Sequence, residues 1–284
     1  MKQSLCAMTS NVEISPGIHL MWLEAPDIAA TAQPGQFITV RCEGLMLRRP
    51  FSVHQADSSR IALLFKIVGR GTLWLSQRQG GDKVDILGPV GNGFSVGSSL
   101  RNLLLVAGGI GIAPLVFLAQ SASPQHSITL IYGASTAREL YPFSSLPLTL
   151  IPSPFEGEGK GEGEKRSNLL SLPDSVRFIP VTEDGSIGKK GMVTDILPDF
   201  LGWADQVYAC GPIDMYKTMA NMSLRAKRSN LKVKRCQVSL EVRMGCGIGA
   251  CYGCTINTRK GLKKVCRDGP VFELADILWE EVSI

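Results

Sequence analysis

The fold is decided by the stretch Asn102-Leu103-Leu104-Leu105-Val106-Ala107-Gly108-Gly109-Ile110-Gly111-Ile112-Ala113-Pro114. Its first part, residues 102–107, is a continuous apolar run, as expected of a strand buried on both faces of a sheet. The glycines that follow predict a tight turn, and residues 113–119 predict a helix. A buried strand, a glycine-rich turn and a helix in this order are typical of an open α/β sheet.

Further strands are predicted on the carboxyl-terminal side, at residues 128–132, 176–181 and 206–209, with a helix at residues 193–200. Strands that alternate with helices indicate a parallel, doubly wound sheet, which we expect within a nucleotide-binding domain at residues 99–235. Ligands of such sheets bind at the carboxyl ends of the strands. The candidate NAD-binding residues are therefore Gly108, Gly109, Gly111, Cys210, Gly211 and Pro212.

The glycine-rich loop lacks the G-x-G-x-x-G spacing, so by itself it indicates little more than a tight turn in a suitable context. Cys210 has two interpretations that the sequence leaves open. It lies either near a nicotinamide ring or in the core as a small buried residue.

Residues 1–98 contain short strands separated by turns, such as residues 36–41, 61–67 and 84–87. This spacing predicts a small antiparallel β-barrel. A strand-like run at residues 45–48 leads into Arg49-Pro50-Phe51-Ser52, where an arginine could hold a pyrophosphate and a serine could bond to a flavin ring. Residues 69–72 precede a predicted helix, whose N-terminal N–H groups favour phosphate. A plain turn is the alternative for residues 49–52.

Four of the eight cysteines lie within residues 246–266. Their spacing, C-x4-C-x2-C-x11-C, is the plant-type [2Fe–2S] spacing, and thiolates are the soft ligands that hold iron–sulfur clusters. The surrounding glycines would let backbone N–H groups point at the sulfur atoms. Zinc is the alternative, but zinc sites usually pair two C-x2-4-C knuckles and only one C-x2-C occurs here. The candidate metal ligands are Cys246, Cys251, Cys254 and Cys266.

Two segments do not fit this pattern. Residues 152–163 alternate glycine with charged residues and cannot bury apolar surface, which predicts a disordered loop. The pentapeptide Lys-Arg-Ser-Asn-Leu occurs twice, at residues 165–169 and 227–231. We expect two insertions in surface loops, near residues 148–171 and 224–231.

The composition argues against several classes of protein. Residues 1–10 contain no long apolar run, so no signal peptide is expected, and no stretch approaches the about 18 apolar residues of a membrane span. The net charge of +5 is concentrated in residues 225–235, which hold six basic residues and no acidic one. A local basic loop of this kind does not indicate a nucleic-acid partner. Cys6, Cys42 and Cys236 are interpreted as ordinary small buried residues.

Together these motifs resemble the ferredoxin–NADP reductase superfamily, and within it the electron-transfer subunits of NAD-linked, class 1B dihydroorotate dehydrogenases. The resemblance rests on residues 47–52, 88–94, 184–186, 191–195, 241–251 and 265–272. It implies an FAD-binding barrel at residues 1–98 and a [2Fe–2S] cluster domain at residues 236–284. It also implies the FAD contacts, which are Arg49, Pro50, Phe51, Ser52, Leu64, Phe65, Lys66, Gly71 and Thr72.

The resemblance further implies a function in pyrimidine biosynthesis. A partner subunit oxidises dihydroorotate at an FMN, and electrons reach NAD+ through the [2Fe–2S] cluster and FAD of this chain. A cytoplasmic heterotetramer with two copies of each subunit is expected, with no nucleic acid or membrane as partner. The alternative is an FAD and [2Fe–2S] NAD(P)H oxidoreductase subunit that exchanges electrons with ferredoxin or sulfur compounds. A non-enzymatic iron–sulfur scaffold is a third class.

No catalytic acid or base is expected, because hydride transfer at a flavin requires mainly positioning. His19, His54 and His126 are scattered and are interpreted as structural or exposed. The preference for NAD over NADP follows from the resemblance alone, since the sequence assigns no acidic residue to a ribose.

Overall fold

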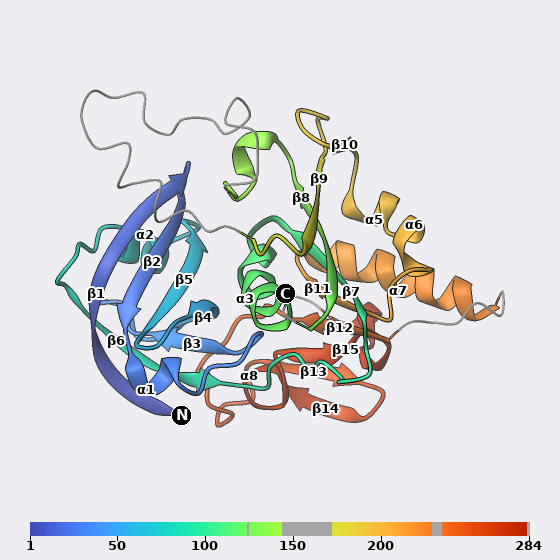
Figure 1. Cartoon of the computed structure of the whole chain (residues 1–284). Coiled ribbons are helices and arrows are strands. Elements are labelled where there is room, and N and C mark those ends of the chain that lie inside the picture. Colours follow the sequence, from blue (N-terminus) through green and yellow to red (C-terminus); the bar gives the residue numbers. More distant parts are fainter. Residues whose placement is uncertain (124, 144–171, 229–234, 283–284) are drawn as a thin grey trace, which may run out of the picture.

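The structure, a computed structural model, describes residues 1–123, 125–143, 172–228 and 235–282. These residues form a closed antiparallel barrel, a seven-stranded sheet and a two-stranded sheet (Figure 1). The barrel and the mostly parallel sheet confirm the predicted fold class. The predicted loop at 152–163 and the insertion at 148–171 lie outside the described residues.

The barrel closes in the strand order β1-β2-β5-β4-β3-β6. Its sequence pattern is clearest in β6, where buried residues alternate with exposed or half-buried ones as the inside and outside of a barrel require. The strands are β1 (Lys2–Ser15), β2 (Ile18–Glu24), β3 (Phe37–Val40), β4 (Arg49–Ala56), β5 (Arg60–Lys66) and β6 (Lys83–Val90). The helices are α1 (Pro26–Ala29) and α2 (Arg70–Ser76).

One strand boundary in the barrel differs from the prediction. The run Leu45-Met46-Leu47-Arg48 is a loop, and the strand begins at Arg49 instead of ending before it. Met46 and Leu47 are exposed, so the apolar residues that suggested a strand do not face a core. The turn that ends β3 and contains Gly44 in a left-handed conformation separates this loop from the preceding strand.

The large sheet has the order β10-β9-β8-β7-β11-β12-β15. Its central strand, β7 (Asn102–Gly108), is buried on both faces as predicted. Leu103 and Leu105 pack in the core on the barrel side, whereas Leu104 and Val106 pack in the core on the opposite side. The other strands are β8 (Ser127–Ala134), β9 (Val176–Thr182), β10 (Lys189–Lys190), β11 (Gln206–Cys210), β12 (Arg235–Ser239) and β15 (Val271–Glu273).

Helices cover both faces of this sheet. Helix α3 (Ile112–Ala122) lies between the sheet and the barrel, whereas α5 (Val193–Ile196), α6 (Pro198–Leu201) and α7 (Ile213–Arg228) lie on the other side (Figure 1). The helix predicted at residues 193–200 is two short helices, because Pro198 has no N–H to continue the first one. Helix α7 extends into the first residues of the segment at 224–231 that was predicted to be an insertion.

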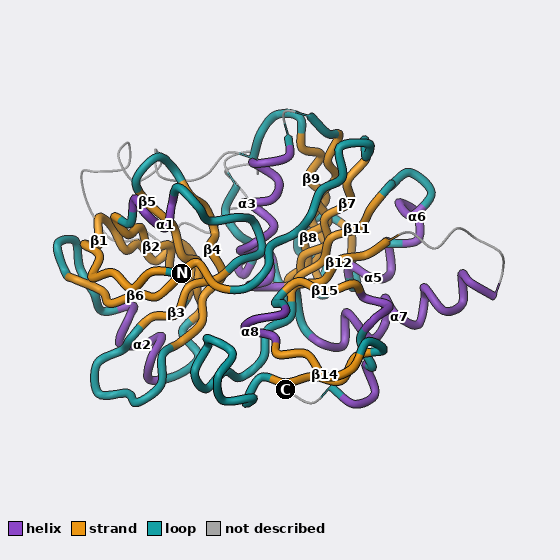
Figure 2. The backbone as a smooth tube through the Cα atoms, turned by 90° about the horizontal axis from the view of Figure 1, so that it is seen from below, coloured by secondary structure: helices purple, strands orange, loops and turns teal. Residues whose placement is uncertain are grey.

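The large sheet includes strands from residues 236–284, which the sequence analysis assigned to a separate cluster domain. Strand β12 pairs in parallel with β11, and β15 pairs antiparallel with β12 at the edge. Between them in the chain lie the hairpin β13 (Thr255–Thr258) and β14 (Gly261–Lys264) and helix α8 (Val265–Asp268), with α8 next to β15 in Figure 2. Short 3-10 helices complete the described chain: η1 (Gly109–Gly111), η2 (Ala137–Glu139), η4 (Leu274–Asp276) and η5 (Trp279–Glu281).

Candidate functional site

A cavity of about 380 Å³ lies between the barrel, the N-terminal end of α3 and the segment after β12. The antiparallel pairing of β4 with β5 brings the start of one strand beside the end of the other. Eight of the nine residues predicted to bind FAD therefore line one cavity: Arg49, Pro50, Phe51, Ser52, Leu64, Phe65, Lys66 and Thr72. The ninth, Gly71, is buried beneath the Arg49 side chain and does not line it.

The cavity has an apolar wall, and the Arg49 guanidinium at its edge is held in place. Phe65 is stacked on His19 with ring centroids 5.4 Å apart, and Phe51 meets the Phe65 ring edge-on at 5.7 Å. The Arg49 guanidinium donates to the carbonyl of Leu47 at 2.9 Å. None of the ion pairs found among the described residues includes Arg49. An arginine without a carboxylate partner beside an apolar cavity suits a ligand with a phosphate group and an aromatic ring.

Thr72 organises the turn at the entrance of α2. Its hydroxyl accepts hydrogen bonds from the backbone N–H groups of Val68 and Gly69 and donates to the Gly69 carbonyl. The side chain thus shapes the edge of the cavity through the loop that it holds.

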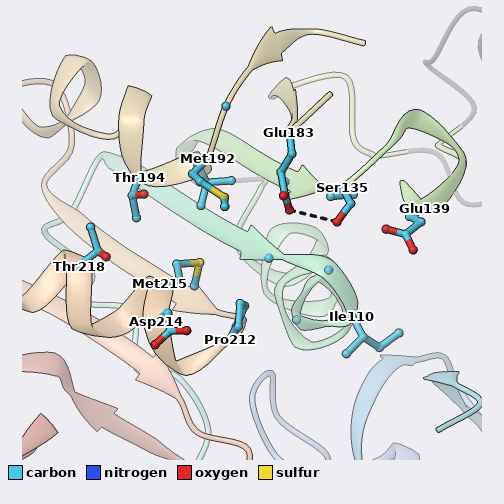
Figure 3. A pocket seen from close by; sticks show the side chains of 18 of the residues that line it. Ile110, Ser135, Glu139, Glu183, Met192, Thr194, Pro212, Asp214, Met215 and Thr218 are labelled. Carbon is cyan, nitrogen blue, oxygen red and sulfur yellow. Dashed lines mark hydrogen bonds between the residues drawn. The ribbon is translucent and has the colours of Figure 1, made fainter. Parts of the chain in front are cut away.

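A second cavity, of about 610 Å³, lies at the carboxyl ends of β7, β8, β9 and β11 (Figure 3). This is the edge at which α/β sheets bind nucleotides. Five of the six residues predicted to bind NAD line it: Gly108, Gly109, Gly111, Gly211 and Pro212. A Cβ atom at Gly111 would lie 2.2 Å from the carbonyl oxygen of Cys210, so only glycine lets the two loops approach this closely.

Cys210 does not line the nucleotide cavity. Its side chain has no exposed surface and packs within the core that α3 and the barrel share. Burial raises the pKa of the Cys210 thiol well above its ordinary value. The interpretation of Cys210 as a small buried residue therefore fits this structure better than a position beside a nicotinamide ring.

Several polar residues that line the same cavity were not identified from the sequence, and two of them are hydrogen-bonded to each other. Glu183 follows β9 and Ser135 follows β8, and the serine hydroxyl donates a hydrogen bond of 3.0 Å to the Glu183 carboxylate (Figure 3). A carboxylate at this edge of a dinucleotide-binding sheet can accept a hydrogen bond from a ribose hydroxyl. The motif Asp184-Gly185-Ser186 immediately after it was a signal that could have identified Glu183.

The two cavities share three lining residues, which are Lys66, Ile110 and Glu241. Lys66 also forms an ion pair with Glu139 at 3.5 Å, which links β5 of the barrel to η2 beside the sheet. The Glu241 carboxyl is open to the cavities but otherwise surrounded by protein, and this desolvation raises its pKa. Ligands in the two cavities would therefore meet at these three side chains.

Three of the four candidate metal ligands, Cys246, Cys251 and Cys254, lie in one loop, here called the cysteine loop (residues 245–254), whose backbone N–H groups point at sulfur. The fourth, Cys266, lies in α8. Cys246 Sγ accepts from the N–H groups of Ile248, Ala250 and Cys251, at 3.2 to 3.5 Å. Partial burial tends to raise the pKa of the Cys246 thiol, but these donors stabilise the thiolate and lower the pKa to about 6. Further sulfur contacts join Gly249 N–H to Cys266 and Gly253 N–H to Cys251.

The thiols are arranged as two pairs. Backbone N–H groups connect Cys246 with Cys251 in both directions, and the N–H of Cys266 donates to Cys254 Sγ at 3.4 Å. Within the described ranges, no three His, Cys, Asp or Glu side chains converge as a single metal ion would require. Four thiols in two pairs, surrounded by N–H donors, fit a two-iron cluster, in which each iron takes two thiolates.

This loop also contacts the barrel. A Cβ atom at Gly247, which has a φ of +71°, would lie 2.9 Å from the Thr39 methyl group on β3. The backbone N–H of Asn92, after β6, donates to the Gly269 carbonyl, which follows α8. The cysteine loop therefore touches β3 of the barrel at Gly247, and the segment after α8 is bonded to the residue that follows β6.

Comparison with known proteins decides the family. A family model described as "Iron-sulfur cluster binding domain of dihydroorotate dehydrogenase B" matches residues 241–278. A relative from Caldanaerobacter subterraneus subsp. tengcongensis, named "Dihydroorotate dehydrogenase B (NAD(+)), electron transfer subunit", is 38% identical over 251 residues, which are 87% of each chain. This chain belongs to that family of electron transfer subunits.

Other comparisons agree with membership of the electron transfer subunit family. A relative of the same name from Desulforamulus reducens is 35% identical over 279 residues, covering 94% of this chain and 95% of the relative. A solved structure of an NADH-dependent reduced ferredoxin-NADP oxidoreductase, described as a flavin-based electron-bifurcating protein, superposes with a TM-score of 0.77. It is 27% identical and covers 98% of this chain and 91% of its own. In the described part of this family member, no helix has the length and apolar character needed to cross a bilayer.

Proposed function

We propose that this chain carries electrons from the FMN of a dihydroorotate dehydrogenase catalytic subunit to NAD+, through a [2Fe–2S] cluster and an FAD. When bound, the cluster supplies one-electron chemistry and the nicotinamide accepts an electron pair as hydride. The flavin can exchange electrons with both, because it transfers either one electron or two. The chain would thus act as the oxidoreductase subunit of an NAD-dependent dihydroorotate dehydrogenase, in pyrimidine biosynthesis.

The observation that carries this proposal is the path of residues 239–246. They begin at the end of β12, line the smaller cavity through Glu241, Val242 and Met244, and enter the cysteine loop at Cys246. Glu241 also lines the nucleotide cavity. One short segment thus connects all three candidate cofactor sites, which supports a relay with the flavin between the cluster and the nucleotide.

Each group of residues has a distinct task in the proposed relay. Cys246, Cys251, Cys254 and Cys266 would hold the cluster. Arg49 would bind the FAD pyrophosphate, while Phe51, Ser52 and Phe65 would hold and orient the flavin. The glycines at the end of β7 and Gly211-Pro212 would allow the nicotinamide nucleotide to approach closely, and Glu183 would accept a ribose hydroxyl. No residue need act as a proton donor in the hydride step.

A partner subunit is implied by the name that the relatives share. We propose that this partner contains FMN and that the complex is a cytoplasmic heterotetramer with two copies of each subunit. Co-expression of the two chains, followed by measurement of the mass of the complex, tests the stoichiometry.

The proposed function is tested by anaerobic purification of the full chain. We expect about two irons and two sulfides per chain, bound FAD, and NADH-dependent reduction of a dye. An FMN-containing dihydroorotate dehydrogenase should co-purify with it. A colourless chain that holds zinc, or one without flavin, would contradict the proposal.

The alternative is a reductase subunit that exchanges electrons with ferredoxin or sulfur compounds. It is favoured by the likeness to the ferredoxin-NADP oxidoreductase structure, at 27% identity. The two functions differ in their electron donors. Dihydroorotate, added with the partner subunit, should reduce the chain under the first proposal. Under the second, reduced ferredoxin or a sulfur compound should reduce it and dihydroorotate should not.

A further inference from the structure

Lys264 lies beside the cysteine loop. This residue ends β14, two positions before Cys266. Its ammonium group donates a hydrogen bond of 2.8 Å to the Gly249 carbonyl and lies 3.7 Å from the centroid of the Tyr252 ring. Both contacts are made to the loop that carries the first three candidate ligands, so the cation is fixed in place by two independent interactions.

The carbonyl that Lys264 binds belongs to a peptide group aimed at sulfur. The N–H of that same peptide is the Ala250 N–H, which donates to Cys246 Sγ at 3.2 Å. A cation on the oxygen of an amide polarises its N–H, so the lysine strengthens the donor on the far side. The Gly249 N–H donates to Cys266 Sγ at 3.1 Å. That N–H belongs to the preceding peptide group, so Lys264 polarises the donor to Cys246 and only holds in place the residue whose own N–H reaches Cys266.

The Tyr252 ring is held in the position that the lysine needs. Tyr252 has a φ of 61°, which is uncommon for a residue with a side chain. Its carbonyl accepts hydrogen bonds from both the N–H and the hydroxyl of Thr255, and these bonds fix the turn. Tyr252 is 66% exposed, so apolar burial does not explain the position of its ring. Its contact with the ammonium group gives this strained turn a role.

Other charges lie nearby but do not neutralise Lys264. The Asp268 carboxylate accepts from the backbone N–H of Lys264, at 2.8 Å, rather than from its ammonium group. No ion pair found in the described part of the chain includes Lys264. Arg267 packs against Gly249 through its aliphatic carbons and adds a second positive charge.

We propose that Lys264 is a positioning residue that raises the reduction potential of the cluster. This inference rests on the proposed [2Fe–2S] site. One-electron reduction adds one negative charge to the cluster, and a fixed cation with polarised N–H donors stabilises that charge. The reduced form is favoured as a result, so the cluster accepts an electron more readily than it would without the lysine.

The test is a redox titration of the full-length chain, with the reduced cluster followed by electron paramagnetic resonance. In K264M, we expect the ratio of reduced to oxidised cluster at a fixed potential to fall by about tenfold, which is a shift of about 59 mV to lower potential for a one-electron couple. K264R keeps the charge and should remain close to the unmodified protein. K263M removes the same charge from the neighbouring residue, whose side chain points to the other face of the strand, and should shift the potential less.

Iron and sulfide content separates the possible failures. A chain without substitutions that holds no iron would overturn the proposed function itself. K264M with full iron content and an unchanged potential would overturn only the role of Lys264. If K264M does not assemble a cluster, K264Q keeps an amide N–H for the Gly249 carbonyl and removes only the charge. An unchanged potential in K264Q with full iron content would rule out tuning by charge. Loss of iron from both K264M and K264Q would overturn the proposal in another way, because Lys264 would then be needed for cluster assembly.

Discussion

The Ser135 hydroxyl donates to the Glu183 carboxylate across the ends of two neighbouring parallel strands, at 3.0 Å. This bond holds an acceptor at the edge of the nucleotide cavity, where a ribose hydroxyl could reach it and a ribose phosphate would meet its negative charge. We therefore predict that Glu183→Gln lowers kcat/KM for NADH by about tenfold or more. The ratio of kcat/KM for NADH to kcat/KM for NADPH should fall as well. Steady-state dye reduction with both nucleotides measures the effect.

Ser135→Ala serves as the matched control for Glu183→Gln, because it removes the hydrogen bond but keeps the carboxylate. It should change kcat/KM for NADH less than the glutamate substitution does. Equal nucleotide preference in Glu183→Gln and the unmodified protein would show that Glu183 does not face the ribose.

A buried histidine predicts how stability depends on pH. His54 on β4 donates from Nδ1 to the Ala113 carbonyl of α3 at 2.9 Å, and Nε2 accepts from the Tyr141 hydroxyl at 3.4 Å. Burial, opposed in part by the bond to Ala113, lowers the pKa of His54 to about 4. The unfolded chain binds the proton below pH 6.5, whereas the folded chain does not until about pH 4. The contribution of His54 to stability is thus complete above pH 6.5 and is lost as the pH falls toward 4.

Between pH 7 and pH 5, this linkage should lower the free energy of unfolding by about 2 kcal/mol. Urea unfolding at the two pH values measures the loss. In His54→Gln, the decrease in the free energy of unfolding between pH 7 and pH 5 should be smaller by about 2 kcal/mol. The variant should be less stable at both pH values, because the substitution disturbs packing. An identical pH dependence in the two proteins would argue against a neutral buried imidazole.

The packing of the cysteine loop on the barrel can be tested at Gly247. A methyl group there would meet the Thr39 side chain and would also require a left-handed backbone conformation. Gly261 has a similar φ of +85° but open space around it. Gly261→Ala therefore carries only the backbone cost, about 1 kcal/mol, whereas Gly247→Ala adds a steric clash. The thermal unfolding temperature should fall further in Gly247→Ala than in Gly261→Ala, and the iron content of Gly247→Ala should also be lower. An equal fall in the two variants would mean that the loop can move away from β3.

Cysteine substitutions distinguish ligands from buried thiols. Cys254→Ser should reduce the iron content from about two per chain to nearly none, since four thiolates are needed for the cluster. Cys236→Ala removes a thiol from the core shared by β12 and α7 and should keep its iron. Iron analysis and the visible absorption spectrum give the result. Full iron content in Cys254→Ser would remove that residue from the ligand set.

Much of the fold could be predicted from local sequence patterns. The apolar run at residues 102–107 predicts a buried strand, and the glycines after it predict a tight turn. The loop at residues 45–48 was mistaken for a strand because its composition is apolar, and only the tertiary structure reveals that Met46 has no core to face. The role of Pro198 as a break between two helices was available in the sequence but was outweighed by the surrounding helical pattern.

The candidate site was predictable wherever ligands are close together in the chain, as the cysteines are. Glu183 was missed because it lies 72 positions after Gly111 and joins the cavity only through the pairing of β8 with β9. Lys264 was missed because its link to Gly249 depends on the hairpin that brings them together. Cys210 was left with two interpretations, because its position at a strand end was clear from the sequence but the direction of its side chain was not.

The antiparallel pairing of β15 with β12 has a mechanical consequence. The cysteine loop is anchored at both ends in the same backbone ladder as the nucleotide domain, so it is not a tethered arm that swings between donor and acceptor. Electrons would cross this subunit by tunnelling over gaps of constant width, and a more viscous solvent should leave the rate of internal transfer unchanged.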